Sequence, residues 1–503
     1  MVLPVGVVVS KKVREYLGDD LLREVFEEGG LAYIAEFGDY LVNDLRDNGV
    51  QSLVVASERE NKELEDFLER IDDFTPIHPL SVERVYLDWF QGKEHGKALL
   101  LAYAYKASMS YLAKRVQPLR RKSVSRRSLV RGKLYYYKPY PVLQQEVQFE
   151  REMNYLSSLC PLIEKSFEGP HVSDPEKCSA CGFCSGMSFL GYLEVPNFTT
   201  DQVVHFLNAL NKYAPRDKPG VVLFTCNKAL KIPKVENAYV YPLIAPCVAS
   251  VHDSFLALTY ATGFYPLVYS PDGACELRDV AKLRVEASMR KFPGTKVPFP
   301  FAQDEAEARD WVEKLSRMPV PQGKQVPEEL VMGRSRRRGL LLWAIKETTV
   351  EDEEEEVPGV YKVVVDPNKC VLCGVCVRSC QMLVFEQIST RDSTTLYHDM
   401  SYCIGSQRCI RNCPEKAITL VGLSKIKDLK KTVASSSQVV RCRYCGKPLD
   451  SYSLKNRVST VLSSLGINDV EDYTDVCNDC KQKLLTKRWV ERVLKNGLRV
   501  NTR

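Results

Sequence analysis

Four closely spaced cysteines constrain the fold of this chain more than any other feature. The stretch DPNKCVLCGVCVRSC holds Cys370, Cys373, Cys376 and Cys380 in a C-x2-C-x2-C-x3-C run. This spacing lets a tight loop bring three thiolates to one iron–sulfur cluster while the fourth thiolate binds another cluster. A zinc site would instead use two separated pairs. The run therefore predicts iron–sulfur binding, with a second segment that shares the two clusters.

That second segment is SYCIGSQRCIRNCPEKA at 401–417, which ends in Cys413-Pro414. Five residues separate Cys403 from Cys409, as they separate the first and third cysteines of the first run, and Ser406 holds the middle place. In bacterial ferredoxins the last cysteine of each run binds the other cluster. Cluster one is thus assigned to Cys370, Cys373, Cys376 and Cys413, and cluster two to Cys380, Cys403 and Cys409 with Ser406 in the fourth place.

Three thiolates suit a 3Fe–4S cluster, because the iron at the corner without a ligand is lost. Two alternatives stay open, a 4Fe–4S cluster with a serine or water ligand and the absence of a second cluster. The segments LVFE at 383–386 and TTLYHD at 394–399 fit the strands of a ferredoxin-like βαβ pair. We expect this two-cluster ferredoxin-like domain to span 361–425.

A third group of cysteines lies upstream in DPEKCSACGFCSG, with Cys178, Cys181 and Cys184. Its opening DP-x-x-C-x-x-C-G-x-C is the same as that of the run at 366–376. We therefore expect another 4Fe–4S cluster in an iron–sulfur segment at 151–200. No Cys-Pro follows, so the fourth ligand is remote; Cys160 is the nearest candidate, and Cys226, Cys247 and Cys275 are the others.

Two further pairs of cysteines lie near the C-terminus, in RCRYCGKP and VCNDCKQ. Separated C-x2-C knuckles fit tetrahedral coordination of zinc. The sequence therefore predicts a zinc ribbon at 438–503, with Cys442, Cys445, Cys477 and Cys480 as ligands. A rubredoxin-like iron site is the alternative, but the second knuckle lacks the glycine that would follow there.

Two other regions repeat each other without a gap, 35–56 and 249–270, so that Gly49 aligns with Gly263 and Leu53 with Leu267. Each copy is preceded by an apolar run that begins with glycine, GVVV at 6–9 and GVVLF at 220–224. The pattern predicts two related α/β units with mostly parallel sheets, at 1–113 and 215–325. With the ferredoxin-like domain and the ribbon, the expected fold class is a multidomain α/β and α+β chain.

The two copies differ where chemistry is expected. Cys226, Cys247 and Cys275 of the second copy follow its strands, and ligands bind beyond the carboxyl ends of parallel strands. The first copy has no cysteine, and the alignment puts Tyr33 opposite Cys247. The second copy is therefore predicted to be the active one, with a possible further cluster, and the first to be structural.

Composition supports metal binding in a reducing compartment. The chain has 18 cysteines, none of them among the first 159 residues, and their grouping favours ligation over disulfides. No apolar stretch approaches the roughly 20 residues that span a bilayer, and the N-terminus lacks the order of a secretory signal. We expect a cytoplasmic protein without a transmembrane segment.

Charge marks the expected connectors. The net charge of +6 comes partly from basic runs at 114–133 and 334–338. We expect a basic, tyrosine-rich connector at 114–150 and a charged linker at 326–360, which contains EDEEEE. Nucleic acid is compatible with these runs but is not an expected partner.

Two regions resemble known redox proteins. Residues 1–113, with SLVVASERENKELEDFLER and YLDWFQGKEHGKALLLAYAYKA, resemble the N-terminal domain of the large subunit of heterodisulfide reductases. Residues 220–320, with FTCNKA, APCVASVHDSF and SPDGACELRD, are similar to the delta subunit of methyl-viologen-reducing hydrogenase. The flavin domain of the reductase is missing, and no G-x-G-x-x-G fingerprint marks a flavin or nicotinamide site.

These features together predict a multi-cluster electron-transfer subunit of a cytoplasmic redox complex. The resemblance implies a dehydrogenase, a hydrogenase or a sulfur or disulfide reductase as its partner. No catalytic residue is expected, and we interpret His171, His252 and His398 as structural. The alternatives are a reductase acting directly at Cys226, Cys247 and Cys275, and a nucleic-acid-binding factor with structural clusters.

Overall fold

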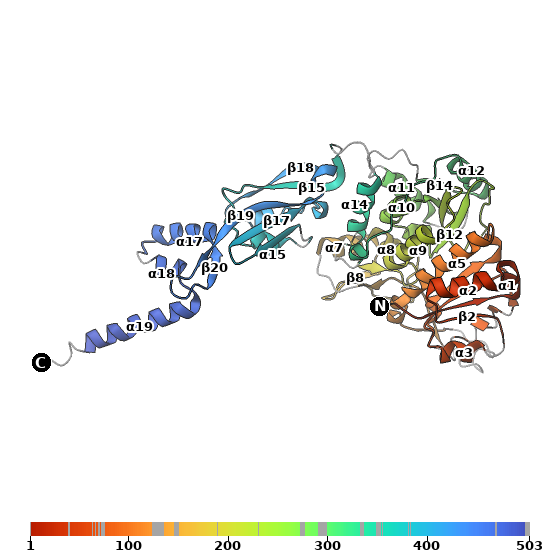
Figure 1. The fold of residues 1–503 in the computed structure, drawn as a ribbon, viewed down its shortest axis with the longest axis horizontal. Coiled ribbons are helices and arrows are strands. Elements are labelled where there is room, and N and C mark those ends of the chain that lie inside the picture. Colours follow the sequence, from red (N-terminus) through yellow and green to blue (C-terminus); the bar gives the residue numbers. More distant parts are fainter. Residues whose placement is uncertain are drawn as a thin grey trace. The chain divides into compact units, whose positions relative to one another are not determined.

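The computed structural model divides the chain into two compact units, Met1–Glu351 and Asp352–Arg503. It describes residues 2–38, 41–62, 64–65, 67–68, 71, 76–122, 135–144, 150–188, 190–229, 231–271, 277–289, 299–331, 336–348, 354, 356–380, 382, 384–467 and 470–497. Each unit combines helices with more than one sheet, as expected of a multidomain α/β and α+β chain (Figure 1).

The N-terminal unit begins with a parallel sheet of order β2-β1-β3-β4. The strands are β1 (Val5–Val9), β2 (Tyr33–Glu36), β3 (Ser52–Ser57) and β4 (Val82–Tyr86). All residues of β1 and β3 are buried, which explains their unbroken apolar sequences, because a parallel sheet is covered on both faces. The helices that the structure describes in this part include α1 (Lys11–Leu17), α2 (Asp19–Gly29), α3 (Leu41–Asp47) and α5 (Lys93–Ser108).

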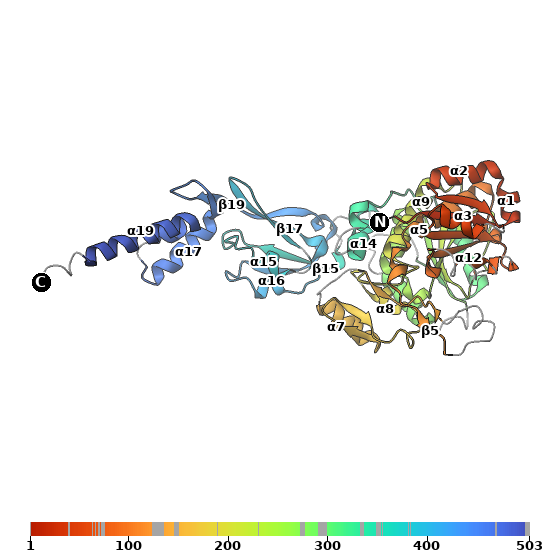
Figure 2. The same cartoon turned by 90° about the horizontal axis from the view of Figure 1, so that it is seen from below.

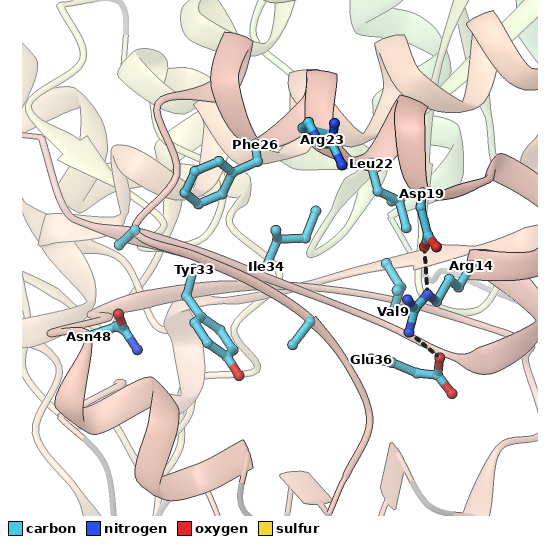
Figure 3. A pocket seen from close by; sticks show the side chains of 12 residues that line it. Val9, Arg14, Asp19, Leu22, Arg23, Phe26, Tyr33, Ile34, Glu36 and Asn48 are labelled. Carbon is cyan, nitrogen blue, oxygen red and sulfur yellow. Dashed lines mark hydrogen bonds and ion pairs between the residues drawn. The ribbon is translucent and has the colours of Figure 1, made fainter.

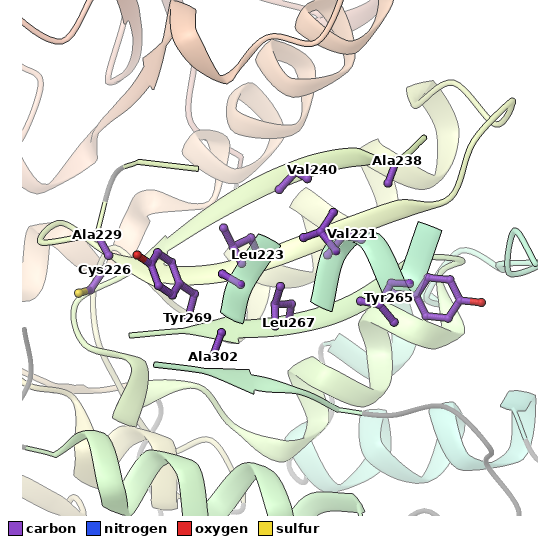
Figure 4. Packing of buried hydrophobic residues seen from close by; sticks show 13 residues of the cluster. Val221, Leu223, Cys226, Ala229, Ala238, Val240, Tyr265, Leu267, Tyr269 and Ala302 are labelled. Carbon is purple, nitrogen blue, oxygen red and sulfur yellow. The ribbon is translucent and has the colours of Figure 1, made fainter. Parts of the chain in front are cut away.

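A second parallel sheet has the equivalent order, β12-β11-β13-β14. Its strands are β11 (Gly220–Cys226), β12 (Tyr239–Ala245), β13 (Tyr265–Tyr269) and β14 (Phe301–Ala302). Val221, Leu223 and Leu267 form its core, and Cys226 lies at one end of that core (Figure 4). The helices that accompany this sheet are α9 (Thr200–Tyr213), α10 (Asp253–Ala261), α11 (Arg278–Met289) and α12 (Glu305–Ser316).

The registers of the two sheets correct one detail of the gapless alignment. Tyr33 pairs with Gly6 in the first sheet, and Tyr239 pairs with Gly220 in the second. Tyr33 therefore corresponds to Tyr239 and not to Cys247. The gapless alignment matches the helix of each copy and the strand that follows it. Because β12 is longer than β2, the same offset does not hold at the edge strand.

The first half of this unit covers the open edge of the second sheet. The side-chain oxygen of Gln91 accepts a hydrogen bond from Val240 N at 2.7 Å, and Tyr103 Oη donates to the carbonyl of Pro242 at 3.0 Å. Helices α5 and α9 pack together, as both views show (Figures 1 and 2). Because polar side chains satisfy the edge of β12, the two α/β parts form one continuous body.

Two segments expected as connectors contribute structure to this unit. Around the basic connector, β5 (Leu119–Arg120) pairs with β6 (Tyr135–Tyr136), and β7 (Val142–Leu143) pairs with β10 (Leu193–Glu194). In the expected linker, α13 (Glu328–Val331) precedes α14 (Arg336–Thr348), which packs on α10. Leu340, Ala344 and Ile345 of α14 are buried, so this part of 326–360 is a core helix. Most of the basic run at 114–133, and the start of EDEEEE, lie outside the described residues.

The C-terminal unit is built on antiparallel strands. In one sheet β15 (Glu356–Val365) pairs with β18 (Ile418–Lys425). The other sheet has the order β16-β17-β19-β20, with β16 (Phe385–Ser389), β17 (Ser393–Asp399), β19 (Lys431–Arg441) and β20 (Pro448–Ser451). The segments expected as a βαβ pair form instead the β16–β17 hairpin, since the short turn between them leaves no room for a helix.

Short helices carry the cysteine loops of this unit, and longer ones end it. The short helices are α15 (Val375–Ser379) and α16 (Arg408–Arg411). The C-terminal part contains α17 (Tyr452–Ser464), α18 (Glu471–Thr474) and α19 (Asn478–Gly497). Across the part of the chain that the structure describes, none of the helices combines the length and apolar character needed to cross a membrane.

Candidate iron–sulfur and metal centres

Three cysteine loops share one unusual backbone conformation. In each loop the second and fourth residues after the first cysteine have positive φ angles, which non-glycine residues rarely adopt. These residues are Leu372 (58°) and Gly374 (70°), Ala180 (56°) and Gly182 (68°), and Gly405 (69°) and Gln407 (59°). The residue between the two is Cys373, Cys181 or Ser406, respectively. Ser406 therefore occupies the backbone place that a cysteine holds in the other two loops.

The first loop and the end of the second run face one cavity. Cys370, Cys373, Cys376 and Cys413 all line it, together with apolar side chains that include Val365, Leu396 and Ile418. Cys376 stands on α15, which begins directly after Gly374. Burial, together with the neighbouring Cys370 and Cys373, raises the pKa of Cys376 to about 12. Four thiols on one apolar wall form the donor set that a 4Fe–4S cluster requires, so these residues fit the cluster.

Two main-chain contacts shape the wall of this cavity. The amide of Ala417 donates a hydrogen bond to Cys413 Sγ at 3.3 Å, and Gln387 Nε2 donates to the carbonyl of Leu372 at 3.1 Å. The first contact would stabilise a thiolate at Cys413, because amide hydrogen bonds favour negative charge on sulfur. Gln387 was missed by sequence reasoning, since nothing in its local sequence marks it as a neighbour of the loop.

A second cavity is lined by Cys380, Cys403 and Cys409, and Ser406 also lies on its wall. Its apolar lining includes Met382, Val384 and Phe385. Burial, followed by the proximity of Cys380 and Cys403, raises the pKa of Cys409 to about 11. A Cβ atom on Gly405 would lie 2.7 Å from the ring of Tyr361, so only glycine fits there. Three thiols and one hydroxyl fit an iron–sulfur cluster with an incomplete thiolate set.

The third loop lies in the N-terminal unit and meets Cys160. Cys184 is buried in a core cluster against which Cys160 and Cys178 pack. Burial, then the nearby thiols of Cys181, Cys160 and Cys178, raises the pKa of Cys184 to about 12. Cys160 follows α7 (Glu150–Leu159), and Cys184 is on α8 (Phe183–Met187). The structure thus brings together the four thiols that the sequence proposed for this group.

Two arginines, one fully buried and one partly buried, hold the helix of the third loop. Arg337 of α14 is fully buried, donates to the carbonyls of Ser185 and Ser188, and pairs with Glu194 at 3.3 Å. Arg284 of α11 donates to the carbonyl of Gly186 at 2.6 Å and to that of Ala249 at 2.7 Å. Arg337, in the basic run at 334–338, is therefore a buried residue of the protein interior and not part of a nucleic-acid surface.

The remaining cysteines of the N-terminal unit lie at strand ends. Cys226 ends β11 and pairs with Ala245, the last residue of β12, and Cys247 lies two residues further on. Both thiols are buried, and Cys226 belongs to a different core cluster from that of Cys184. Cys275 lies outside the described residues. The two described cysteines thus share the carboxyl edge of the sheet, but the core clusters do not place them with the Cys178 group.

The three histidines interpreted as structural from the sequence have different settings. His252 is buried and caps α10, accepting a hydrogen bond from Ser254 N at 3.0 Å. His171 is an exposed residue of β9 (Pro170–Val172). His398 is on β17, and burial lowers its pKa. The helix cap is consistent with a structural role for His252.

The C-terminal knuckles meet at a compact site. The sulfur atoms of Cys442, Cys445, Cys477 and Cys480 all lie within 4.8 Å of one another, and those of Cys445 and Cys477 are 3.6 Å apart. The amide of Cys477 donates to Cys442 Sγ at 3.4 Å and helps to lower the pKa of Cys442 to about 6. With metal–sulfur bonds of about 2.3 Å, tetrahedral ligands are about 3.8 Å apart. The four residues therefore fit a single metal ion.

A cavity of about 720 Å³ lies in the first α/β part, away from any described cysteine loop. It runs between α2 and the edge strand β2, where Phe26, Tyr33 and Ile34 provide an apolar lining (Figure 3). Arg14 closes one end with hydrogen bonds to Asp19 at 2.7 Å and to Glu36 at 3.2 Å. None of the proposed metal ligands lines this cavity.

Comparison with known proteins supports the ferredoxin assignment. Residues 363–385, which contain all four cysteines of the first run, match the 4Fe-4S binding domain family. A search of curated proteins finds no match. The chain is therefore an iron–sulfur protein with a ferredoxin-type domain that binds a 4Fe–4S cluster, and an electron-transfer role follows from that domain.

Proposed function

We propose that this chain is a multi-cluster electron-transfer subunit of a redox complex. The observation that carries the proposal is the shared backbone of the three cysteine loops, each of which directs sulfur ligands to an enclosed or core position. A 4Fe–4S cluster, when bound, accepts and releases single electrons without proton transfer by a side chain. No general base or nucleophile is needed for that role.

The proposed ligand sets follow the cavities. Cluster one is a 4Fe–4S cluster and cluster two a 3Fe–4S cluster, with a serine-ligated 4Fe–4S cluster as its alternative. The third set, in the N-terminal unit, binds a 4Fe–4S cluster, and the C-terminal knuckles bind zinc. Their ligands are Cys370, Cys373, Cys376 and Cys413; Cys380, Cys403 and Cys409 with Ser406; Cys160, Cys178, Cys181 and Cys184; and Cys442, Cys445, Cys477 and Cys480.

The protein's own contribution is to exclude water and to fix the loops. Val365 and Leu396 line the first cavity, and Met382 and Phe385 line the second. Apolar surroundings and amide hydrogen bonds to sulfur are the means by which a protein sets a cluster potential. Because one cavity presents Ser406 where the other presents Cys373, the two centres would differ in potential.

The proposed partners are a dehydrogenase, a hydrogenase or a sulfur or disulfide reductase in the cytoplasm. Support comes from the resemblance of the two α/β parts to subunits of such complexes, and from the described cysteines, all of which are free of disulfides. Cytoplasmic thiols stay reduced, as ligands must.

Anaerobic purification with the native partners tests this function. We expect iron, sulfide and zinc in the purified chain, iron–sulfur signals in electron paramagnetic resonance, and reduction of those centres by the co-purifying subunit. A chain that contains only structural zinc, or clusters that no partner reduces or oxidises, would contradict the proposal. Salt-dependent RNA binding with redox-inert clusters would instead support the nucleic-acid alternative.

A second candidate function is direct reduction of sulfur or a disulfide at Cys226 and Cys247. It is favoured by their position at the carboxyl edge of a parallel sheet and by the close approach of Gly182, in the third loop, to Ser250, three residues after Cys247. Cys226→Ser and Cys247→Ser discriminate the two functions. Lost turnover with intact cluster reduction would indicate a catalytic site, whereas unchanged turnover would leave electron transfer as the function.

A further inference from the structure

Helix α19 (Asn478–Gly497) continues from the second knuckle, and Asp479, Lys481 and Arg488 of its first three turns make side-chain contacts with the rest of the unit. Its first turn contains Cys480, and Arg488 pairs with Asp472 of α18. From Trp489 onward, within the described part of the helix, no hydrogen bond or ion pair joins it to another element. The side chains from Trp489 to Lys495 are all exposed, so about two turns of this helix are open to solvent on every side.

One face of these turns is apolar and exposed. Trp489 is 66% exposed and Leu494 is 60% exposed, and Leu485, Val490 and Val493 are exposed as well. Leu485, Trp489 and Val493 follow one another at intervals of four residues, which places them in one stripe. At about 100° per residue the five side chains cover an arc of about 180°, with Val493 near its middle and Lys483 inside the arc beside Val490.

The opposite face is basic. Lys481, Arg488, Arg492 and Lys495 fall within an arc of about 60°, whose centre lies about 140° from the middle of the apolar arc. Two of them also contact the rest of the unit, since Lys481 donates to the carbonyl of Tyr473 at 3.1 Å and Arg488 pairs with Asp472. The helix contains six Lys or Arg residues against Asp479 and Glu491, and the six residues that follow it add Arg499 and Arg503. Such a basic end adjacent to an apolar face attracts an anionic surface.

The charge decides between the possible occupants of the apolar face. A second copy of the helix would bring another strongly basic segment against the first and would be repelled. A helix with Lys and Arg on its polar face and Trp and Leu on the other is suited to lie in the plane of a lipid interface. Anionic headgroups complement the basic arc, and tryptophan is favoured at the boundary between headgroups and acyl chains. We propose that α19 binds the surface of an anionic membrane and places the redox chain there.

Vesicle co-flotation of the full-length, cluster-loaded chain tests this proposal. The vesicles contain equal amounts of phosphatidylglycerol and phosphatidylcholine, with phosphatidylcholine alone as the neutral comparison. We expect binding only to the anionic vesicles, weakened as salt rises because the attraction is screened. Lys495→Gln should weaken binding by about fivefold, the effect of one basic residue near such a surface.

Trp489→Glu should abolish binding, and Leu465→Glu is the matched control. Leu465 is 70% exposed after α17 in the same part of the chain but lies off the α19 face. Iron and zinc contents are measured for both variants, and both should equal those of the unmodified chain. Any of three results would overturn the proposal: no binding to anionic vesicles, equal binding to neutral vesicles, or equal loss in both variants. Self-association abolished by Trp489→Glu, without vesicle binding, would assign the face to a second copy.

Discussion

Ser451 Oγ donates a hydrogen bond to the carbonyl of Val371 at 3.2 Å. Val371 directly follows Cys370, and Ser451 joins β20 to α17 in the C-terminal knuckle region. A second contact links the same parts, since Arg457 of α17 pairs with Glu415, two residues after Cys413, at 2.8 Å. The proposed zinc ribbon therefore supports both chain segments that carry the ligands of cluster one.

Removal of the Ser451 hydroxyl should loosen this support. Ser451 Oγ also caps α17 by accepting a hydrogen bond from Leu454 N at 3.2 Å. We expect Ser451→Ala to lower the free energy of unfolding of the C-terminal unit by about 1–2 kcal/mol and to speed the loss of 4Fe–4S absorbance in air. Ser464→Ala, at an exposed serine at the end of the same helix, is the control. Equal effects of the two substitutions would contradict a specific contact.

Ser406→Cys should complete the ligand set of the second cavity. The left-handed residues on either side of Ser406 hold it in the place of Cys373, so a cysteine there would face the same cavity as Cys403 and Cys409. We expect about one more iron per chain and replacement of the 3Fe–4S resonance signal by that of a cubane. Ser401→Cys adds a thiol that does not line the cavity and should change neither reading. An unchanged, purely cubane spectrum would rule out the 3Fe–4S assignment.

Cys160→Ser should leave the cluster of the N-terminal unit with three thiolate ligands. Cys160 packs in the same core as Cys178 and Cys184, whereas Cys226 packs in another. We expect Cys160→Ser to lower the iron content by about one per chain, as conversion to a 3Fe–4S cluster would, and Cys226→Ser to leave it unchanged. The reverse pattern, measured by iron and sulfide analysis, would move the fourth ligand to the carboxyl edge of the second sheet.

Glu152 should make the stability of the N-terminal unit depend on pH. Burial raises the pKa of Glu152 to about 7 from an ordinary 4.5, although Ser188 donates a hydrogen bond to it at 2.5 Å. A raised pKa favours the protonated folded state, so stability is highest at low pH and falls as pH rises from about 4.5 to 7. The pKa difference corresponds to a loss of about 3 kcal/mol above pH 7.

Urea unfolding between pH 5 and 8 measures this loss. Glu152→Gln stays neutral at every pH and should flatten the slope, whereas Glu164→Gln, at an exposed carboxylate of the neighbouring strand β8 (Ile163–Lys165), should keep it. A slope that survives in Glu152→Gln would assign the pH dependence to another group.

The sequence revealed those features that depend on local spacing. The cysteine spacings marked the loops now seen at two cavities and at the compact knuckle site, and the glycine-led apolar runs marked β1 and β11. Spacing could not show that Arg337 is a core residue, because its partner Glu194 is 143 positions away. In isolation RSRRR indicates a solvated, basic segment. Only the fold supplies the buried carboxylate that turns one of its arginines inward.

Strand β19 has a consequence for how the C-terminal unit is assembled. It pairs with β17 through Ser393–Gln438 and with β20 through Arg441–Pro448, and the first knuckle follows it directly at Cys442. One continuous strand thus belongs both to the hairpin between the two cysteine runs and to the ribbon. We expect metal insertion to be ordered during biosynthesis: an ion bound by the knuckles would align β19 first, and the aligned hairpin would then present preformed loops to the machinery that delivers iron and sulfide.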